Sequence, residues 1–297
     1  MRGKNHTRRD FLKNAAASAA AGALFLGDTA SAAPEPGPKS RVVLVRDRGL
    51  LDAAGAPRPE AVRRMLDQAV AALLDERDPL RAWRRLFSPS DTVGVKTNEW
   101  NYLRTPLALE AAIRKRIMDA GVSGKKISVR DRGIRDDDIF EKSTALVNVR
   151  PMRTHHWAGV GSLIKNYIQF ARLPFMYHGD SCADLAEIWN FPEVKGRTRL
   201  NVLVMFTPLF HGVGPHHFNR RYVWAYQGLL VGADPVAVDS TGVRILLAKR
   251  REFFNEDRPL SPPPKHVFLA DTRHRLGTAD PNRIELVRLG WKEGSLI

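Results

Sequence analysis

Polar side chains gather at four places in the sequence, each just after a short apolar run that predicts a β-strand. The clusters are Lys96-Thr97-Asn98, Arg130-Asp131, Arg153-Thr154-His155-His156, and the loop from His211 to His217. In an open α/β sheet, ligands bind outside the carboxyl ends of the strands. We therefore expect the four clusters to converge on one crevice at that edge of the sheet.

The histidines of the last two clusters indicate a metal site as one interpretation. Neutral imidazole binds zinc, copper, nickel and iron. Adjacent side chains on a strand diverge, so only one histidine of each doublet can join His211. The predicted ligand set for a divalent metal is therefore His155, His211 and His216. Two other interpretations stay open: loop histidines that bind backbone carbonyls, and general acid or base catalysis.

Two further groups lie on predicted helices. Lys165 and Asn166 belong to a helix expected over 160–170, where Lys165 is either a solvated surface lysine or a clamp for an anion. Asp239 lies in the first turn of an otherwise apolar helix. Because the helix dipole favours a carboxylate at that end, a structural role and a catalytic role are both open for Asp239.

Together these residues predict one site. The candidate catalytic residues are Lys96, His155, Lys165 and Asp239, and the candidate ligand-binding residues are Asn98, Arg153, Asn166, Gly212 and Gly214. Two lysines in one partly buried crevice repel each other, and an unpaired buried ammonium is costly. The site therefore implies a small anionic ligand, or an internal carboxylate partner such as Asp131 or Asp239.

The elements that must position these residues alternate between strand and helix. Apolar runs predict strands at 41–45, 92–95, 127–129, 145–149, 200–206, 222–231, 266–270 and 284–287. Helical periodicity and cap residues predict helices at 59–74, 80–87, 105–120, 160–170, 181–189 and 234–249. This alternation predicts an α/β fold with a largely parallel sheet covered by helices on both faces.

The first 32 residues match a twin-arginine signal peptide. Thr7 to Lys13 reads T-R-R-D-F-L-K, an alanine-rich run covers 15–26, and Ala30-Ser31-Ala32 fits a cleavage site. A bilayer span needs about 20 apolar residues, so we expect no stable membrane span after cleavage, with an uncleaved anchor as the alternative. A linker over 33–40 then leads to a single α/β domain over 41–297. We expect the twin-arginine translocase to export the folded protein to the periplasm.

Charge and cysteine content limit the cofactors and partners. The chain has a formal charge of +15, which suits anionic substrates or envelope phosphates, although a solvated basic surface is the alternative. Export would take nucleic acid out of reach as a partner. Cys182 is the sole cysteine of the sequence, so the chain cannot form an internal disulfide or hold an iron-sulfur cluster on cysteines.

Several motifs, in order, resemble the family called domain of unknown function 362. The resemblance covers most of the chain from Val42 onward and is carried by 93–98, 147–155, 162–166, His178, 212–215, 232–239 and 276–280. Many relatives carry a cysteine-rich, ferredoxin-like segment that this sequence lacks, so the resemblance implies no redox function here. Arg153 also stands where relatives tend to have lysine, and the strand ending at Phe206 lacks an acidic residue often found there.

Two functions of different classes follow from these observations. The first is a periplasmic enzyme that acts on a small anionic substrate, with or without a histidine-bound metal. The second is a non-catalytic periplasmic protein that binds an anionic ligand or an envelope component.

The export signal makes a direct prediction. Replacing Arg8 and Arg9 together with lysine should leave the precursor in the cytoplasm, because the translocase reads the arginine pair. Cell fractionation checks this, with Arg2→Lys as a control that changes an arginine outside the pair. Normal periplasmic accumulation of the double variant would contradict the assignment.

Overall fold

Strands and helices alternate in space as the apolar pattern predicts. The computed structural model describes residues 39–212 and 218–297, which belong to a unit beginning at Pro38. The predicted signal peptide over 1–32 and most of the linker lie outside the described residues. The strands are β1 (Ser40–Arg46), β2 (Val93–Lys96), β3 (Ile127–Arg130), β4 (Ala145–His155), β5 (Gly159–Gly161), β6 (Thr198–Leu209), β7 (Gly228–Gly232) and β8 (Ile284–Gly290).

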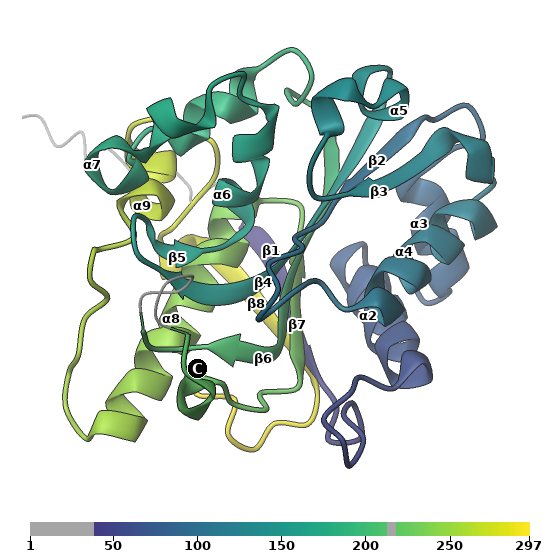
Figure 1. The fold of residues 1–297 in the computed structure, drawn as a ribbon. Helices are drawn as coiled ribbons and strands as arrows, with labels where there is room; N and C mark the ends of the chain where they lie inside the picture. Colours follow the sequence, from purple (N-terminus) through teal and green to yellow (C-terminus); the bar gives the residue numbers. More distant parts are fainter. Residues whose placement is uncertain (1–38, 213–217) are drawn as a thin grey trace, which may run out of the picture. The chain divides into compact units, whose positions relative to one another are not determined.

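The helices flank one eight-stranded sheet of order β3-β2-β4-β6-β7-β1-β8, in which β5 pairs with β4 (Figure 1). They are α2 (Pro59–Leu73), α3 (Pro79–Leu86), α4 (Leu107–Asp119), α5 (Asp138–Glu141), α6 (Leu163–Asn166), α7 (Gly179–Cys182), α8 (Pro235–Phe254) and α9 (Lys265–Thr272). Neighbouring strands are parallel except where β7 pairs with β6 and β1, and where β5 pairs with β4. The predicted α/β fold with a largely parallel sheet is confirmed.

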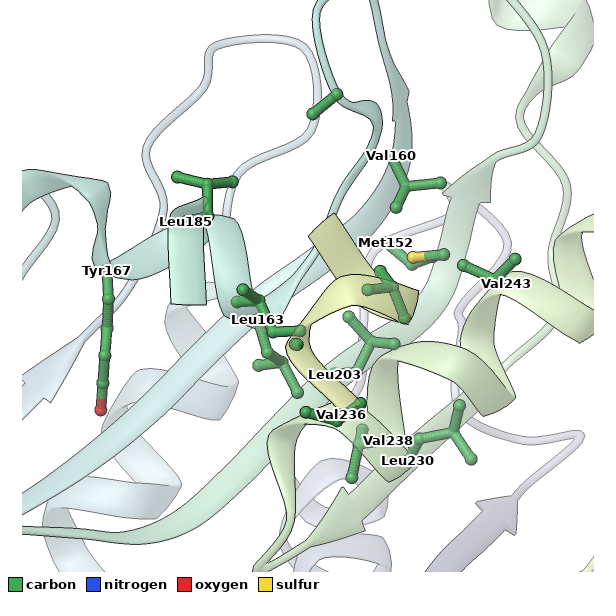
Figure 2. Packing of buried hydrophobic residues seen from close by; sticks show 14 of the residues in the cluster. Met152, Val160, Leu163, Tyr167, Leu185, Leu203, Leu230, Val236, Val238 and Val243 are labelled. Atoms are coloured by element: carbon green, nitrogen blue, oxygen red, sulfur yellow. The ribbon is translucent and has the colours of Figure 1, made fainter. Parts of the chain in front are cut away.

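Alternate residues of each strand face two separate hydrophobic cores. Val43 and Val45 of β1 pack on the side of α2, α3 and α4, whereas Val42 and Leu44 pack on the side of α6, α8 and α9. Figure 2 shows the second core, where Leu163 of α6 and Val236 of α8 lie near Leu203 of β6. Burying one such side chain contributes about 2 kcal/mol, so the strand register is strongly specified.

One predicted strand is a helix. Residues 266–270 form part of α9, because the buried side chains His266, Val267 and Ala270 follow helical spacing while Phe268 is 46% exposed. A short apolar run does not distinguish a buried strand from a helix. The expectation of a strand at 266–270 was therefore wrong.

Other predicted elements are shorter than expected. The segment 160–170 begins as β5 and continues as α6 and a 3₁₀ helix, Tyr167–Phe170. The segment 181–189 begins inside α7, whose Asp180 and Ser181 have left-handed φ angles, and continues into a 3₁₀ helix, Leu185–Asn190. The expected strand 222–231 is reduced to β7. Among the described residues, no helix is long and apolar enough to cross a membrane.

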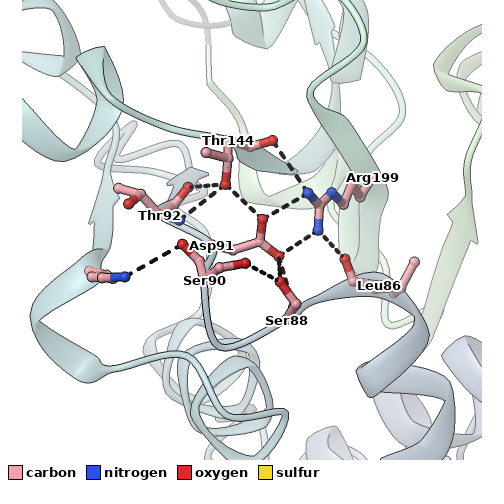
Figure 3. A network of polar contacts seen from close by, with 8 residues as sticks. Leu86, Ser88, Ser90, Asp91, Thr92, Thr144 and Arg199 are labelled. Carbon is pink, nitrogen blue, oxygen red and sulfur yellow. Dashed lines mark hydrogen bonds and ion pairs between the residues drawn. The ribbon is translucent and has the colours of Figure 1, made fainter.

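Asp91 joins the chain just before β2 to the first residues of β6 (Figure 3). Its carboxylate accepts two hydrogen bonds from Arg199, at 2.7 and 2.8 Å, and one from the Thr144 hydroxyl at 2.7 Å. Burial raises the pKa of Asp91, but the hydrogen bonds from Arg199, Thr144 and Ser88 outweigh it and lower the pKa to about 2. The ionised carboxylate therefore stabilises the fold above about pH 4, and this contribution is lost as the pH falls toward 2.

Arg199→Met should lower the free energy of unfolding by about 2 kcal/mol at pH 7, because Asp91 loses its bidentate partner. Denaturant unfolding between pH 7 and pH 3 should show this difference narrowing below pH 4. Arg41→Met is the matched control, since its ion pair with Glu285 is exposed and should contribute less than about 1 kcal/mol. If Arg199→Met lowers the free energy of unfolding by the same amount at every pH, the ionisation of Asp91 does not contribute to stability as described.

Candidate functional site

A cavity of about 290 Å³ opens at the carboxyl ends of β2, β3 and β4. These strands are parallel, so their ends share one edge of the sheet. Five predicted site residues line this cavity, and they are Asn98, Arg153, His155, Lys165 and Asn166. The structure also adds lining residues that the sequence did not single out as site residues, among them Trp100, Arg132, Arg150 and Trp157.

Lys96, predicted as a catalytic residue, lies beneath the cavity in an internal ion pair. Its Nζ donates to Asp131 Oδ1 at 2.6 Å and to the Thr97 carbonyl at 2.7 Å, and the side chain is completely buried. Burial lowers the pKa of Lys96 to about 8, against the opposing effect of Asp131. Burial raises the pKa of Asp131, but the charge and hydrogen bond of Lys96 reverse this and lower it. Lys96 therefore has the internal carboxylate partner that the sequence offered as one alternative.

Asn166 connects α6 to β2 and β4 through hydrogen bonds. Its Nδ2 lies 3.1 Å from the carbonyl of Lys96, 2.8 Å from Asn148 Oδ1 and 3.1 Å from the carbonyl of Val149. Asn148 in turn donates to the carbonyl of Leu163 at 3.0 Å. Because these groups are buried, each lost hydrogen bond would leave a costly unpaired polar atom. Asn166 thus positions the floor of the cavity.

Asp239, also predicted as catalytic, holds the first turn of α6. Its carboxylate accepts from the Ser162 hydroxyl at 2.7 Å and from the backbone N–H groups of Leu163 and Ile164, each at 2.9 Å. Burial raises the pKa of Asp239 to about 6, although these hydrogen bonds oppose it. Asp239 is completely buried and does not line the cavity. These contacts fit the structural role that the sequence left open for Asp239.

Three buried cations form the wall of the cavity, and they are Arg150, Arg153 and Lys165. Each is less than 5% exposed. Within residues 39–212 and 218–297, none of them forms an ion pair, and Arg150 Nε, Arg153 Nε and Arg153 Nη1 are buried without a hydrogen-bond acceptor. The Arg153 guanidinium instead stacks on Trp100, 4.2 Å from the ring centroid. The wall therefore presents several unused N–H donors.

Burial makes this wall an unfavourable place for positive charge. It lowers the pKa of Arg150 to about 10 and lowers that of Arg153 well below its ordinary value, with the neighbouring Arg150 charge adding to the effect on Arg153. The negative charge of Asp131 opposes the shift at both arginines, and that of Asp239 opposes it at Arg150, but neither carboxylate forms an ion pair with them. Guanidinium groups nevertheless stay protonated inside proteins. An anion between them would supply a counter-charge in direct contact and the missing acceptors.

Both arginines reach the cavity because β4 is irregular. The pairing of β4 with β6 shifts between Pro151 and Arg153. In a regular strand, side chains three residues apart point to opposite faces, but a bulge of this kind re-aims them. Proline inside a buried strand is typical of such bulges, so Pro151 was the signal in the sequence that could have predicted the shared orientation of Arg150 and Arg153.

His155 contributes a neutral imidazole. Its Nδ1 accepts from the backbone N–H of Trp157 at 3.2 Å, so the proton of the neutral ring lies on Nε2. Burial, followed by the charges of Lys165 and Arg153, lowers the pKa of His155 far below its ordinary value. The turn that carries Trp157 requires Gly159, whose φ is +71° and where a Cβ would lie 2.4 Å from the carbonyl oxygen of Pro262.

Lys165 lines the cavity and has no ion-pair partner among the described residues, whereas Lys96 beneath the cavity is paired with Asp131. Its Nζ lies 3.5 Å from the Sγ of Cys182. Burial lowers the pKa of Lys165 to about 8 and raises that of the Cys182 thiol. Lys165 can therefore bind an anion as an ammonium ion or accept a proton as an amine.

Two of the predicted metal ligands, His155 and His211, line different cavities. His211 lines a different cavity with Gly212 and Thr154, and its Nδ1 accepts from Arg250 at 3.0 Å. Thr154 and His155 are neighbours in β4 and line different cavities, as expected of successive side chains in a strand. Gly214 and His216 lie outside the described residues. In the part of the chain that the structure describes, no group of three histidine, cysteine or acidic side chains is placed to hold a metal ion.

Comparison with known proteins identifies no relative of this chain. No family model, curated protein or solved structure matches the chain. The resemblance to domain of unknown function 362 therefore stays a prediction.

Two substitutions distinguish a buried cation that has an ion-pair partner, Lys96, from one that has none among the described residues, Arg153. Lys96→Met should lower the free energy of unfolding by about 3–5 kcal/mol, because it leaves the Asp131 carboxylate buried and unpaired. Arg153→Met should leave the stability unchanged or raise it, because it removes an uncompensated charge. Denaturant unfolding at pH 7 in a zwitterionic buffer checks this, and an equal loss in both variants would show that Arg153 has an internal partner.

Proposed function

We propose that the cavity binds a small anion. The observation that carries this proposal is the wall of Arg150, Arg153 and Lys165, three buried cations with no carboxylate paired to any of them among the described residues. Both arginines also have buried N–H donors without an acceptor. Buried charges in proteins are normally paired. A bound phosphate, sulfate or carboxylate group would provide the pairing.

The size and the donors of the cavity limit the ligand. A volume of about 290 Å³ lies at the lower end of the range for small-molecule sites, roughly 300–1,000 Å³. The arginine side chains offer forked donors that match the oxygens of a phosphate or carboxylate. The Nε2–H of His155 supplies a neutral donor beside them.

A catalytic role is the second candidate, and the pKa of Lys165 favours it. A general base works best when its pKa is close to the working pH, and burial brings Lys165 to about 8. In this account Lys165 removes a proton from the bound anion while the two arginines hold the anionic group. A non-catalytic binding protein uses the same cations without that proton transfer. The predicted export signal would bring either activity to the periplasm.

Inorganic sulfate is a suitable probe, because its charge is constant between pH 6 and pH 9. Lys165 is protonated below about pH 8 and neutral above it, so sulfate affinity should fall as the pH rises through 8. Lys165→Met should bind sulfate more weakly at pH 7 and with a flatter pH profile. Arg153→Met should lose roughly 10- to 100-fold in affinity, the equivalent of a charge-assisted hydrogen bond.

Isothermal titration calorimetry at constant ionic strength measures these affinities. Lys125→Met is the matched control, since it removes one exposed lysine charge without touching the cavity. Sulfate affinities that are equal in the parent, Arg153→Met and Lys165→Met would reject the anion site.

A further inference from the structure

Lys165 has the surroundings of an amine that reacts with carbonyl groups. It lines the cationic cavity, although only 3% of the residue is exposed. Within residues 39–212 and 218–297 it forms no ion pair, and its Nζ has one hydrogen-bond partner, the Sγ of Cys182 at 3.5 Å. Burial raises the pKa of that thiol, so a neutral group and not a carboxylate faces Nζ. This contact does not hold Lys165 in its protonated form.

The amine form of Lys165 is accessible close to neutral pH. Burial lowers the pKa of Lys165 to about 8, although Cys182 opposes this. The positive charges of Arg150 and Arg153 act in the same direction as burial. Desolvation and neighbouring cations are the conditions that make a lysine a nucleophile toward carbonyl compounds. Lys96, by contrast, is held in an ion pair and does not line the cavity.

The neighbours of Lys165 in the cavity select the carbonyl compound. Arg150 and Arg153 have buried N–H donors without an acceptor, and forked donors of this kind match a carboxylate. His155 presents a neutral Nε2–H, which suits the oxygen of a carbonyl group. In a 2-oxo acid the carboxylate is bonded directly to the carbonyl carbon. Binding of the carboxylate to the arginines therefore brings that carbon into the same cavity as the lysine amine.

We propose that Lys165 forms an imine with the carbonyl carbon of a small 2-oxo acid whose carboxylate is bound by Arg150 and Arg153. This inference rests on the proposed anion site and adds the substrate class and the bond that forms. The amine nitrogen adds to the carbonyl carbon, the carbonyl oxygen takes up the two protons of the amine and leaves as water, and a C=N bond remains. The step needs no oxidant or reductant.

Reductive trapping tests the imine on the purified protein at pH 8. Sodium cyanoborohydride reduces an imine to a stable secondary amine, so pyruvate should leave an adduct that peptide mass spectrometry assigns to one residue. At limiting pyruvate, Lys165 should be modified roughly 100-fold more than the average exposed lysine, because an amine of ordinary pKa is that much more protonated at pH 8. Excess inorganic sulfate should suppress the modification of Lys165 alone, since it competes for the arginines.

The outcomes separate the imine from the anion site beneath it. No adduct on Lys165, or one no greater than that on exposed Lys125, would overturn the imine. Sulfate binding by the same protein would then leave the proposed function intact. Failure of sulfate to bind would overturn the anion site and the inference together.

Arg153→Met tests whether the carboxylate sets the specificity. At pH 9, where the amine form predominates, this variant should trap limiting pyruvate on Lys165 roughly 10- to 100-fold less, because a charge-assisted hydrogen bond is lost. Trapping of hydroxyacetone, a neutral ketone, should change little. Arg84→Met is the matched control, since Arg84 is exposed on α3 and does not line the cavity. Unchanged pyruvate trapping in Arg153→Met, or an equal loss with both ketones, would overturn the assignment of a 2-oxo acid.

Discussion

Positive charge buried without an ion-pair partner is the constraint on which the site depends. Lys96 is neutralised by Asp131, but Arg150, Arg153 and Lys165 surround the cavity above it without such a partner among the described residues. Taking an ion out of water costs several kcal/mol even after relaxation. A chain tolerates this cost where other interactions hold the cations in place and a ligand neutralises them.

Those other interactions are visible around α6. Asp239 of α8 binds the start of this helix, and Asn166 ties its end to β2 and β4. A helix of four residues has little stability of its own, so these buried hydrogen bonds determine where Lys165 lies. Asp239 and Asn166 therefore act through position, whereas Arg150, Arg153 and Lys165 present their donors to the cavity.

The sequence was most informative where a pattern is local. Alternation of apolar runs with helical periodicity predicted the parallel sheet, and the position of polar clusters after strands brought Asn98, His155 and Lys165 to one edge. What it missed depends on tertiary geometry. The short run at 266–270 suits a strand or a helix equally, and packing against α8 makes it a helix. The orientation of Arg150 depends on the irregularity between Pro151 and Arg153. His155 and His211 line different cavities, because Thr154 of β4 faces the cavity of His211 and His155 faces the other one.

The most direct test of the anion site is a crystal structure of the mature protein soaked in selenate, with data collected at the selenium absorption edge. If the cavity binds anions, an anomalous peak should lie in it, with selenate oxygens within about 3.2 Å of nitrogen atoms of Arg150 and Arg153. A cavity without selenium at saturating selenate, with the two guanidinium groups bonded to carboxylates of the protein, would contradict it.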